Sequence, residues 1–380
     1  MRRVKGLVAC AGIVAGIAGC AAQGTTTPKV TGSQLRVYVS APSGASPDVV
    51  AAEQLAYANA AHRVGRFSLK LVVLRRKASD NARTAIENAS AIAYIGEVEP
   101  GASADSIGIT NAQDLLQVSP TDTAVELTRA TQADKGAPGR YYESRKTYGR
   151  TFARVVPTSA AEARAQVTEM RSLGVKKVYV TDDSSPYGRA VAYEVEHDVT
   201  APMTAVQGLP EAARVSSSGA DAVFFGGTSA KQATALFNGV GKLKRLAPSG
   251  LYSNGFVQGL SPAARAGLYV SSPGFLARNL PAAARSQFQQ PFVAAYHRQP
   301  IPEAIFGYEA VSAVLAVLKQ AGSAANQRAT VVLDFNRLHD RSSVLGSYSI
   351  DAYGGPTIAP FVFARVHGTT LVPFRSVGGS

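Results

Sequence analysis

Short apolar runs alternate with longer, helix-like stretches through the first half of the chain. The runs have the length and the aliphatic content of β-strands, and the first stretch between them is Ala-rich, with Asp48 expected as its N-cap. Predicted strands cover residues 35–39, 67–74 and 91–95, and predicted helices cover 48–62 and 81–90. This order of strand, crossover helix and strand predicts a parallel sheet with helices on both faces.

The same rhythm restarts at residue 152. Here Ser159 is expected to cap a helix whose apolar positions recur with helical spacing until Gly174 stops it. Predicted strands cover 152–156, 177–180, 220–225, 250–253 and 268–271. Predicted helices cover 159–173, 229–240, 281–297 and 302–320. Residues 344–374 are predicted to form strands joined by Gly-rich turns. Two halves with one plan predict two similar α/β lobes.

The loops after the predicted strands are the expected ligand-binding positions. In open parallel sheets ligands bind beyond the carboxyl ends of the strands, and two facing lobes would close such loops around a small molecule. These loops are 40–46, which contains Ser43, and 96–103, 119–123, 182–188, 226–229 and 253–256.

The N-terminus has the pattern of an export signal. Three basic residues within 1–5 precede an apolar run, 6–19, that is too short to span a membrane but fits a signal peptide. The run ends in Ile-Ala-Gly followed by Cys20, which resembles a bacterial lipoprotein signal in which Cys20 is lipidated and becomes the first mature residue. The alternative is an ordinary signal peptide with an accidental cysteine. Residues 20–33 are expected to be a flexible tether to the extracytoplasmic face of the cytoplasmic membrane.

Charge and composition exclude several functions. The net charge of +13 falls to +10 once Arg2, Arg3 and Lys5 are removed, and the remaining basic residues are spread along the chain without interleaved aromatics. We therefore expect a solvated basic surface and no nucleic-acid partner. No nucleophile motif occurs, Leu243 breaks the weak phosphate-loop pattern, and the five histidines lack metal-ligand spacing. We expect no enzyme activity, no metal and no cofactor.

Four segments carry a resemblance to a known family. They are residues 58–66 (Ala-Asn-Ala-Ala-His-Arg-Val-Gly-Arg), residues 95–96 (Ile-Gly) with 118–128 (Val-Ser-Pro-Thr-Asp-Thr-Ala-Val-Glu-Leu-Thr), residues 183–188 (Asp-Ser-Ser-Pro-Tyr-Gly) and residues 221–227 (Asp-Ala-Val-Phe-Phe-Gly-Gly). In this order and at these spacings they resemble the type I periplasmic binding proteins, in particular the Leu/Ile/Val-binding branch of ABC-transporter substrate-binding proteins. The resemblance covers nearly the whole mature chain.

The resemblance implies an α/β Venus-flytrap with two Rossmann-like lobes, parallel sheets and a hinge. It implies three crossovers, which we expect near 154–157, 273–274 and 345–347. Lobe I would then comprise 34–154 and 275–345, and lobe II would comprise 155–274 and 346–380. The implied ligand is an amino acid or related polar metabolite that is passed to an ABC permease.

The resemblance also implies site residues. Thr123 matches a hydroxyl that holds the polar head of the ligand, and Tyr187 matches a tyrosine that covers the ligand from the second lobe. Each has a structural alternative, since Tyr187 would also suit a satisfied core position and Thr123 a helix N-cap.

Several positions depart from the family pattern. Pro100 stands where a carboxylate-gripping serine is usual, so the backbone of Gly101 and Ala102 and the hydroxyl of Ser103 would have to substitute. Other departures are Asp122 in place of a small residue, Asn254 in place of an acid that anchors a ligand ammonium, and Thr228 in place of an aromatic residue. The pattern indicates the family scaffold with a changed ligand, with Asp122 as a possible new source of negative charge.

Two other classes of function remain open on the sequence. The same fold could serve a ligand-sensing receptor that is not coupled to transport. An envelope hydrolase or scaffold protein is the third reading, and the absent nucleophile motifs argue against the hydrolase.

Overall fold

The computed structural model describes residues 28–142 and 149–378. The predicted signal peptide and Cys20 lie outside these residues. The expected tether, 20–33, is too long at its C-terminal end, because residues 28–30 are bound to the first lobe. Val30 is buried, its N–H donates to the carbonyl of Asn326 (2.8 Å), and its own carbonyl accepts from the Asn326 amide (2.9 Å).

The first lobe is built on a six-stranded sheet. In spatial order its strands are β2 (Arg63–Val64), β3 (Phe67–Leu74), β1 (Gln34–Ser40), β4 (Ala91–Ile95), β5 (Leu116–Ser119) and β6 (Phe152–Arg154). All neighbours are parallel except β2 and β3, which form an antiparallel pair. The central strands are almost entirely buried, as expected for a parallel sheet covered on both faces.

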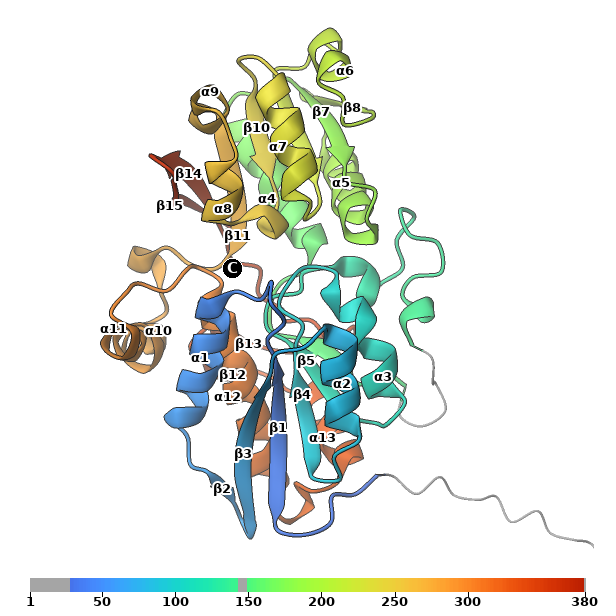
Figure 1. Ribbon diagram of the computed structural model, residues 1–380, viewed down its shortest axis with the longest axis vertical. Helices are drawn as coiled ribbons and strands as arrows, with labels where there is room; N and C mark the ends of the chain where they lie inside the picture. Colours follow the sequence, from blue (N-terminus) through green and yellow to red (C-terminus); the bar gives the residue numbers. More distant parts are fainter. Residues whose placement is uncertain (1–27, 143–148, 379–380) are drawn as a thin grey trace, which may run out of the picture.

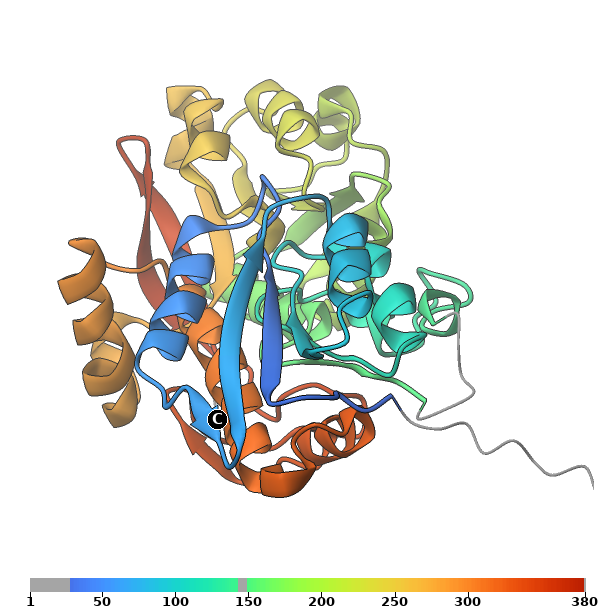
Figure 2. The ribbon, with the colours of Figure 1, turned by 60° about the horizontal axis from the view of Figure 1, so that its bottom comes forward.

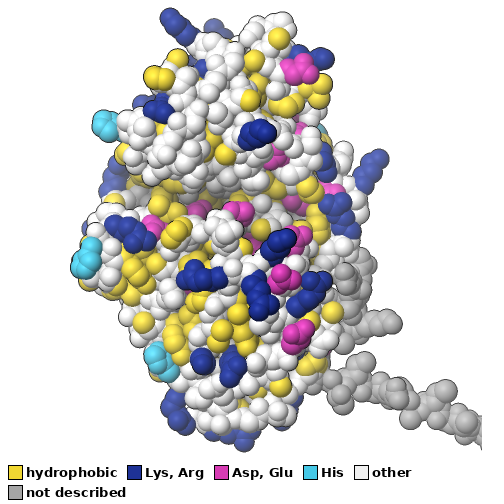
Figure 3. Space-filling model, viewed as in Figure 1, with side chains coloured by type: hydrophobic (Ala, Val, Ile, Leu, Met, Phe, Trp, Pro, Cys, Tyr) yellow, Lys and Arg dark blue, Asp and Glu magenta, His cyan; other side chains and the backbone are white. Residues whose placement is uncertain are grey.

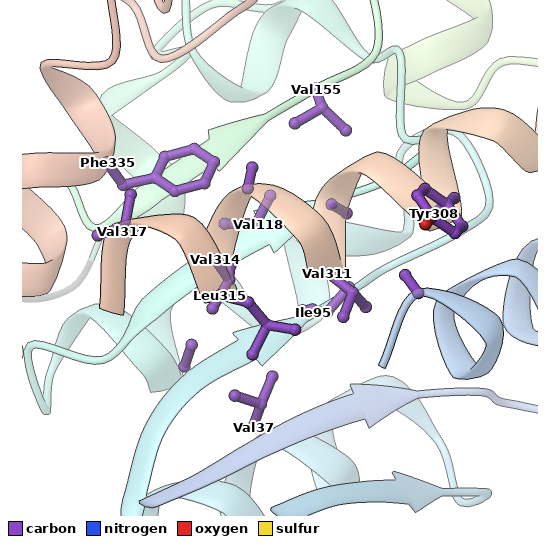
Figure 4. Packing of buried hydrophobic residues seen from close by; sticks show 14 of the residues in the cluster. Val37, Ile95, Val118, Val155, Tyr308, Val311, Val314, Leu315, Val317 and Phe335 are labelled. Atoms are coloured by element: carbon purple, nitrogen blue, oxygen red, sulfur yellow. The ribbon is translucent and has the colours of Figure 1, made fainter. Parts of the chain in front are cut away.

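Helices cover both faces of this sheet (Figures 1 and 2). One face carries α1 (Pro47–Ala58), α12 (Ala304–Ala321) and α13 (Arg328–Asn336), and α10 (Ala282–Ala284) and α11 (Gln290–Tyr296) lie beside α1. The other face carries α2 (Ala78–Ile86) and α3 (Ile107–Asn111). Val311, Val314 and Leu315 of α12 pack over Val37 and Ile95 of the strands (Figure 4).

Helix α12 is the one helix among the described residues that is long and apolar enough to cross a membrane. Most of it is buried, and its side chains form the centre of the first lobe's core. Its apolar surface is therefore already covered by protein.

The second lobe is built on a seven-stranded sheet. In spatial order its strands are β15 (Thr370–Val377), β14 (Phe361–His367), β11 (Leu268–Pro273), β10 (Lys244–Ala247), β9 (Ala222–Gly226), β7 (Lys177–Asp182) and β8 (Thr204–Gln207). The strands from β11 to β8 are parallel, and β14 and β15 are antiparallel additions at one edge. One face carries α4 (Ser159–Ser172) and α5 (Pro186–Asp198); the other carries α6 (Ala212–Ser217), α7 (Ala230–Gly239), α8 (Asn254–Gln258) and α9 (Pro262–Ala266).

The chain passes between the sheets three times. It leaves the first sheet at Arg154 and the second at Pro273, and it enters the second again at Phe361. The third passage follows the hairpin of β12 (Arg341–Ser343) and β13 (Gly346–Tyr348), so it lies later than the expected 345–347. The reason is Tyr348, which packs into the first lobe's core and donates to Glu309 of α12 (2.7 Å).

The lobes also pack directly against each other along one side. Ile107, Leu127 and Phe152 of the first lobe share one apolar cluster with Tyr187 and Val191 of α5. We call this contact the interlobe seam.

Some predicted elements are wrong. Residues 250–253 were expected to be a strand, but 249–251 form a 3-10 helix, and the strand of this region is β10. Helix α13 was not expected. The expected caps are also wrong: the N-cap positions are Ser46 for α1 and Thr158 for α4, and neither side chain makes a capping hydrogen bond. The Asp48 carboxylate and the Ser159 hydroxyl accept from the distant N–H groups of Ile301 and Val125.

Candidate functional site

A cavity of about 660 Å³ lies between the two lobes, and Figure 3 shows the hollow on the surface. Its walls come from the start of α1, the loop after β4, the start of α7, the segment after β10 and the segment before α12. The lining residues are Gly44, Ser46, Pro47, Asp48, Val98, Glu99, Pro100, Thr228, Ala230, Ser249, Gly250, Leu251, Tyr252, Ser253, Arg298, Ile301 and Glu303.

The position of the cavity follows from the topology. Strands β1 and β4 of the first sheet and β9 and β10 of the second all end at it, so four of its five walls are loops beyond strand carboxyl ends. The fifth wall, residues 298–303, follows no strand. The expectation that ligands bind beyond the carboxyl ends of strands therefore does not predict this wall.

Asp122 is the most constrained of the predicted site residues. Its side chain is fully buried, and its two oxygens accept from the backbone N–H groups of Gly101 (2.6 Å), Ser103 (2.8 Å) and Ala124 (3.1 Å). Arg154 lies beside it and donates to its carbonyl (3.0 Å). Burial raises the pKa of Asp122, while Arg154 and the N–H groups act in the opposite direction. In this structure Asp122 therefore supplies no charge to the cavity.

The loop after β4 is bound in the same way. Gly101 and Ser103 were expected to bind the ligand, but their N–H groups are held by Asp122. The Ser103 hydroxyl accepts from the Glu97 N–H (3.1 Å), and the Ala102 N–H donates to the Glu99 carbonyl (3.1 Å). The donors proposed to replace the missing serine are thus engaged within the protein.

Thr123 and Tyr187 come together across the lobes, as the resemblance implies, but both are buried and neither lines the cavity. The Tyr187 hydroxyl donates to Glu162 (3.4 Å), which is the behaviour of a satisfied core tyrosine. Thr123 Oγ1 has no hydrogen-bond partner among residues 28–142 and 149–378. Thr123 is also not an N-cap, since Ala124 precedes the next short helix.

The other three predicted residues are dispersed. Thr228 lines the cavity, and its N–H donates to Asp183 (2.9 Å). Ser43 lines a separate hollow at the outer side of α1. Asn254 accepts from the Leu371 N–H (3.1 Å) and lines a groove beside α10. Of the nine predicted residues, Thr228 alone lies on the cavity wall.

Charged residues that the sequence did not indicate stand on the wall instead. The Asp48 carboxylate pairs with Arg298 and accepts from the Ile301 N–H (3.0 Å). Glu303 precedes α12, and burial, together with the nearby Glu162 and Asp48 carboxylates, raises its pKa to about 8. Glu99 lies across the cavity mouth over Gly44. A carboxylate in a loop has no sequence signal of its own, which is why these residues were missed.

No group of three or more His, Cys, Asp or Glu side chains within the described part of the chain is placed to hold a metal ion. The cavity wall consists of carboxylates, hydroxyls and apolar groups around an open space. Such a wall can bind and orient a small molecule.

Solved structures share this fold. A leucine-binding protein, LivK, from Thermotoga maritima superposes with a TM-score of 0.75 at 18% identity, covering 90% of this chain and 99% of that one. The branched-chain amino-acid transporter protein LivJ from Streptococcus pneumoniae, solved with isoleucine, gives 0.71 at 16%, covering 91% and 99%. A solute-binding protein of an ABC transporter from R. palustris, solved with benzoate, gives 0.68 at 18%, covering 92% and 97%.

None of the curated proteins matches the chain. The family described as periplasmic binding protein matches residues 75–370. Its members are periplasmic binding proteins, and the structural neighbours are described as leucine-binding, substrate-binding or solute-binding proteins, not enzymes. The fold, the interlobe cavity and this match lead to one conclusion: the chain is a solute-binding protein that belongs to the periplasmic binding protein family, with the type I fold.

Proposed function

We propose that this protein is a lipid-anchored receptor that binds a small polar metabolite, an amino acid or a related compound, and delivers it to an ABC permease. The observation that carries the proposal is the 660 Å³ cavity at the carboxyl ends of strands from both lobes. A cavity of this size suits a molecule of metabolite dimensions. The structural neighbours named above are described as binding leucine, isoleucine or benzoate.

The anchor is proposed from the sequence, where Cys20 follows a signal-like segment. The described chain leads into β1, which begins at the end of lobe I that lies away from the second lobe (Figure 1). A lipid on Cys20 would therefore hold lobe I near the membrane and leave the cavity free.

The test of solute binding is a thermal-shift screen of the purified full-length protein against amino acids, small amides, sugars, polyamines and short peptides. A ligand at a hundredfold its Kd stabilises the folded state by about 2.7 kcal/mol, which raises Tm measurably. Ala230→Trp, on the cavity wall at the start of α7, should abolish the shift by filling the cavity.

The matched control is Ala213→Trp, which adds the same side chain at an exposed position of α6 that does not line the cavity. It should leave the shift unchanged. A shift that survives Ala230→Trp would place binding outside this cavity, and a panel without any shift would contradict the proposed function.

A further inference from the structure

The cavity wall is acidic although the chain as a whole is basic. Among the described residues that line it are three carboxylates, Asp48, Glu99 and Glu303, and one guanidinium, Arg298. Acidic side chains gather along the hollow between the lobes, whereas basic side chains are spread over the surface around it (Figure 3). In a chain with a net charge of +13, this distribution sets the cavity apart.

The one cation on the wall is not free. Arg298 is paired with Asp48, whose second oxygen is held by the Ile301 N–H. Within residues 28–142 and 149–378, no basic side chain forms an ion pair with Glu99 or Glu303. Glu99 therefore leaves a negative charge for a ligand, and Glu303 leaves a carboxyl group whose raised pKa a bound ammonium ion would lower again.

Helix N-termini usually favour anions, and three helices of eight or more residues begin at the cavity. Each already has a carboxylate from the protein. Asp48 lies in the first turn of α1, Asp183 accepts from the Thr228 and Ser229 N–H groups (2.9 and 3.1 Å) before α7, and Glu303 immediately precedes α12.

The loop after β4 repeats this arrangement. Two consecutive turns of backbone aim the Gly101 and Ser103 N–H groups at one place, which is the geometry that holds a carboxylate. Asp122 fills that place. The N–H groups before α7 and in the loop after β4 are thus bound by carboxylates of the chain, and Asp48 and Glu303 place acidic groups at the starts of α1 and α12.

We propose that the ligand is an organic ammonium compound without a carboxylate beside its amine, such as a primary amine, a diamine or a guanidinium-bearing amine. This proposal rests on the proposed function, since it names the substrate class of the same cavity. Glu99 and Glu303 accept the ammonium hydrogen bonds, and the Ser46 and Ser253 hydroxyls complete the polar wall. A zwitterionic amino acid would bring its own carboxylate to a wall whose guanidinium, Arg298, is already paired with Asp48.

The experiment compares three matched pairs that differ by one carboxylate: 3-methylbutylamine with leucine, putrescine with ornithine, and agmatine with arginine. Isothermal titration of each compound into the full-length protein gives the six dissociation constants. We expect at least one amine to bind and to bind at least tenfold more tightly than its carboxylated partner. Tighter binding of the amino acid in every responding pair would overturn this inference and leave the proposed function standing.

Absence of binding for all six compounds and for the wider panel would overturn both proposals.

Two variants test whether the amine binds at the proposed carboxylates. Glu303→Gln and Glu99→Gln should each weaken amine binding tenfold or more. Glu87→Gln is the matched control, because Glu87 is an exposed glutamate that does not line the cavity. Glu99 is itself exposed, so Glu99→Gln tests the idea even if Glu303→Gln folds poorly. Unchanged amine affinity in Glu99→Gln would contradict the proposal that Glu99 binds the ammonium group.

Discussion

The Asp122 carboxylate binds the loop after β4, while the buried Arg154 donates to the Asp122 backbone carbonyl and its positive charge acts on the carboxylate. A buried ion contributes little net stability when paired but leaves a large penalty when its partner is removed. The backbone N–H groups of Gly101 and Ser103 would lose their acceptor at the same time.

Asp122→Ala should therefore lower the free energy of unfolding by about 3–5 kcal/mol, measured by urea denaturation. Because the vacated position faces two N–H donors, formate or acetate should restore part of this loss in the variant and none in the wild type. Asp80→Ala, which removes an exposed partner of Arg83, should cost less than about 1 kcal/mol. If Asp122→Ala lost as little unfolding free energy as the control, the Asp122 carboxylate would not be what holds the loop after β4.

Glu303 makes stability depend on pH. Its folded-state pKa is raised to about 8 by burial and by Glu162 and Asp48; Tyr252 and the Arg298 of the Asp48 pair are the other ionisable groups near it. A raised carboxyl pKa means that the folded state binds the proton more tightly, so this contribution is present at low pH and is lost as pH rises toward 8.

Glu303→Gln removes that titration. Between pH 5 and pH 8 the variant should gain at least about 1 kcal/mol of unfolding free energy relative to the wild type. Parallel urea unfolding curves at the two pH values, with Glu87→Gln as the control, measure the difference. Equal pH dependence in variant and wild type would mean that the carboxyl is not buried in solution.

The sequence was least informative about the contacts of individual site residues. The family resemblance pointed to Thr123 and Tyr187, and a departure from its pattern pointed to Asp122; Thr123 and Tyr187 do lie close together. The sequence could not indicate that Asp122 folds back onto the Gly101 loop, since that contact depends on the register of two distant loops. The sequence also could not indicate that Glu303 lines the cavity, because the packing of α12 places it there.

Helices α1 and α12 approach each other closely at Gly307. At Gly307 a Cβ atom would lie 2.5 Å from the Val49 carbonyl oxygen, so only glycine allows this approach. The contact fixes the start of α1 relative to the segment before α12, which are two walls of the cavity.

Gly307→Ala should therefore destabilise the protein by about 1–3 kcal/mol through overpacking, although alanine favours the helix itself by up to about 1 kcal/mol. Thermal and urea unfolding measure the change. Gly255→Ala in α8 is the control, because a Cβ there meets no atom closer than 4.0 Å. Its effect should be neutral or stabilising, and the same result for Gly307→Ala would show that the helices separate easily.

Elements with a strong period or a continuous apolar run were predictable. Strands β3, β4 and β11 and helices α4 and α12 lie close to the expected ranges, because burial on both faces or on one stripe selects the residue pattern. Strand β10 was missed because it begins with Lys244 and Arg245; the buried Arg245 donates to carbonyls of Phe237 and Val240 instead of reaching solvent.

At the scale of the whole molecule, the proposed anchor makes location depend on one atom, the sulfur of Cys20. In cells, Cys20→Ser should prevent lipidation and move the protein from the membrane fraction to the soluble or secreted fraction. Metabolic labelling with a radioactive fatty acid and membrane fractionation measure this, with Cys10→Ser as the control because Cys10 lies in the segment expected to be removed. Membrane retention of Cys20→Ser without label would contradict the anchor.

The two-lobed plan was predictable because the rhythm of strands and helices restarts after the first sheet, and the four family segments are distributed over both lobes. The third passage between lobes was placed too early, since a two-stranded hairpin has the same sequence signs as a strand of the main sheet.

The interlobe seam and the cavity are two separate regions between the lobes, and they share no residue. Rotation about the seam is then the motion that opens the cavity while Leu127, Phe152 and Val191 remain packed. Such an axis restricts entry and exit to the edge formed by the starts of α1 and α7 and by the segment after β10. In such a rotation Tyr187, which packs in the seam, would move less than Glu99, which lines the cavity.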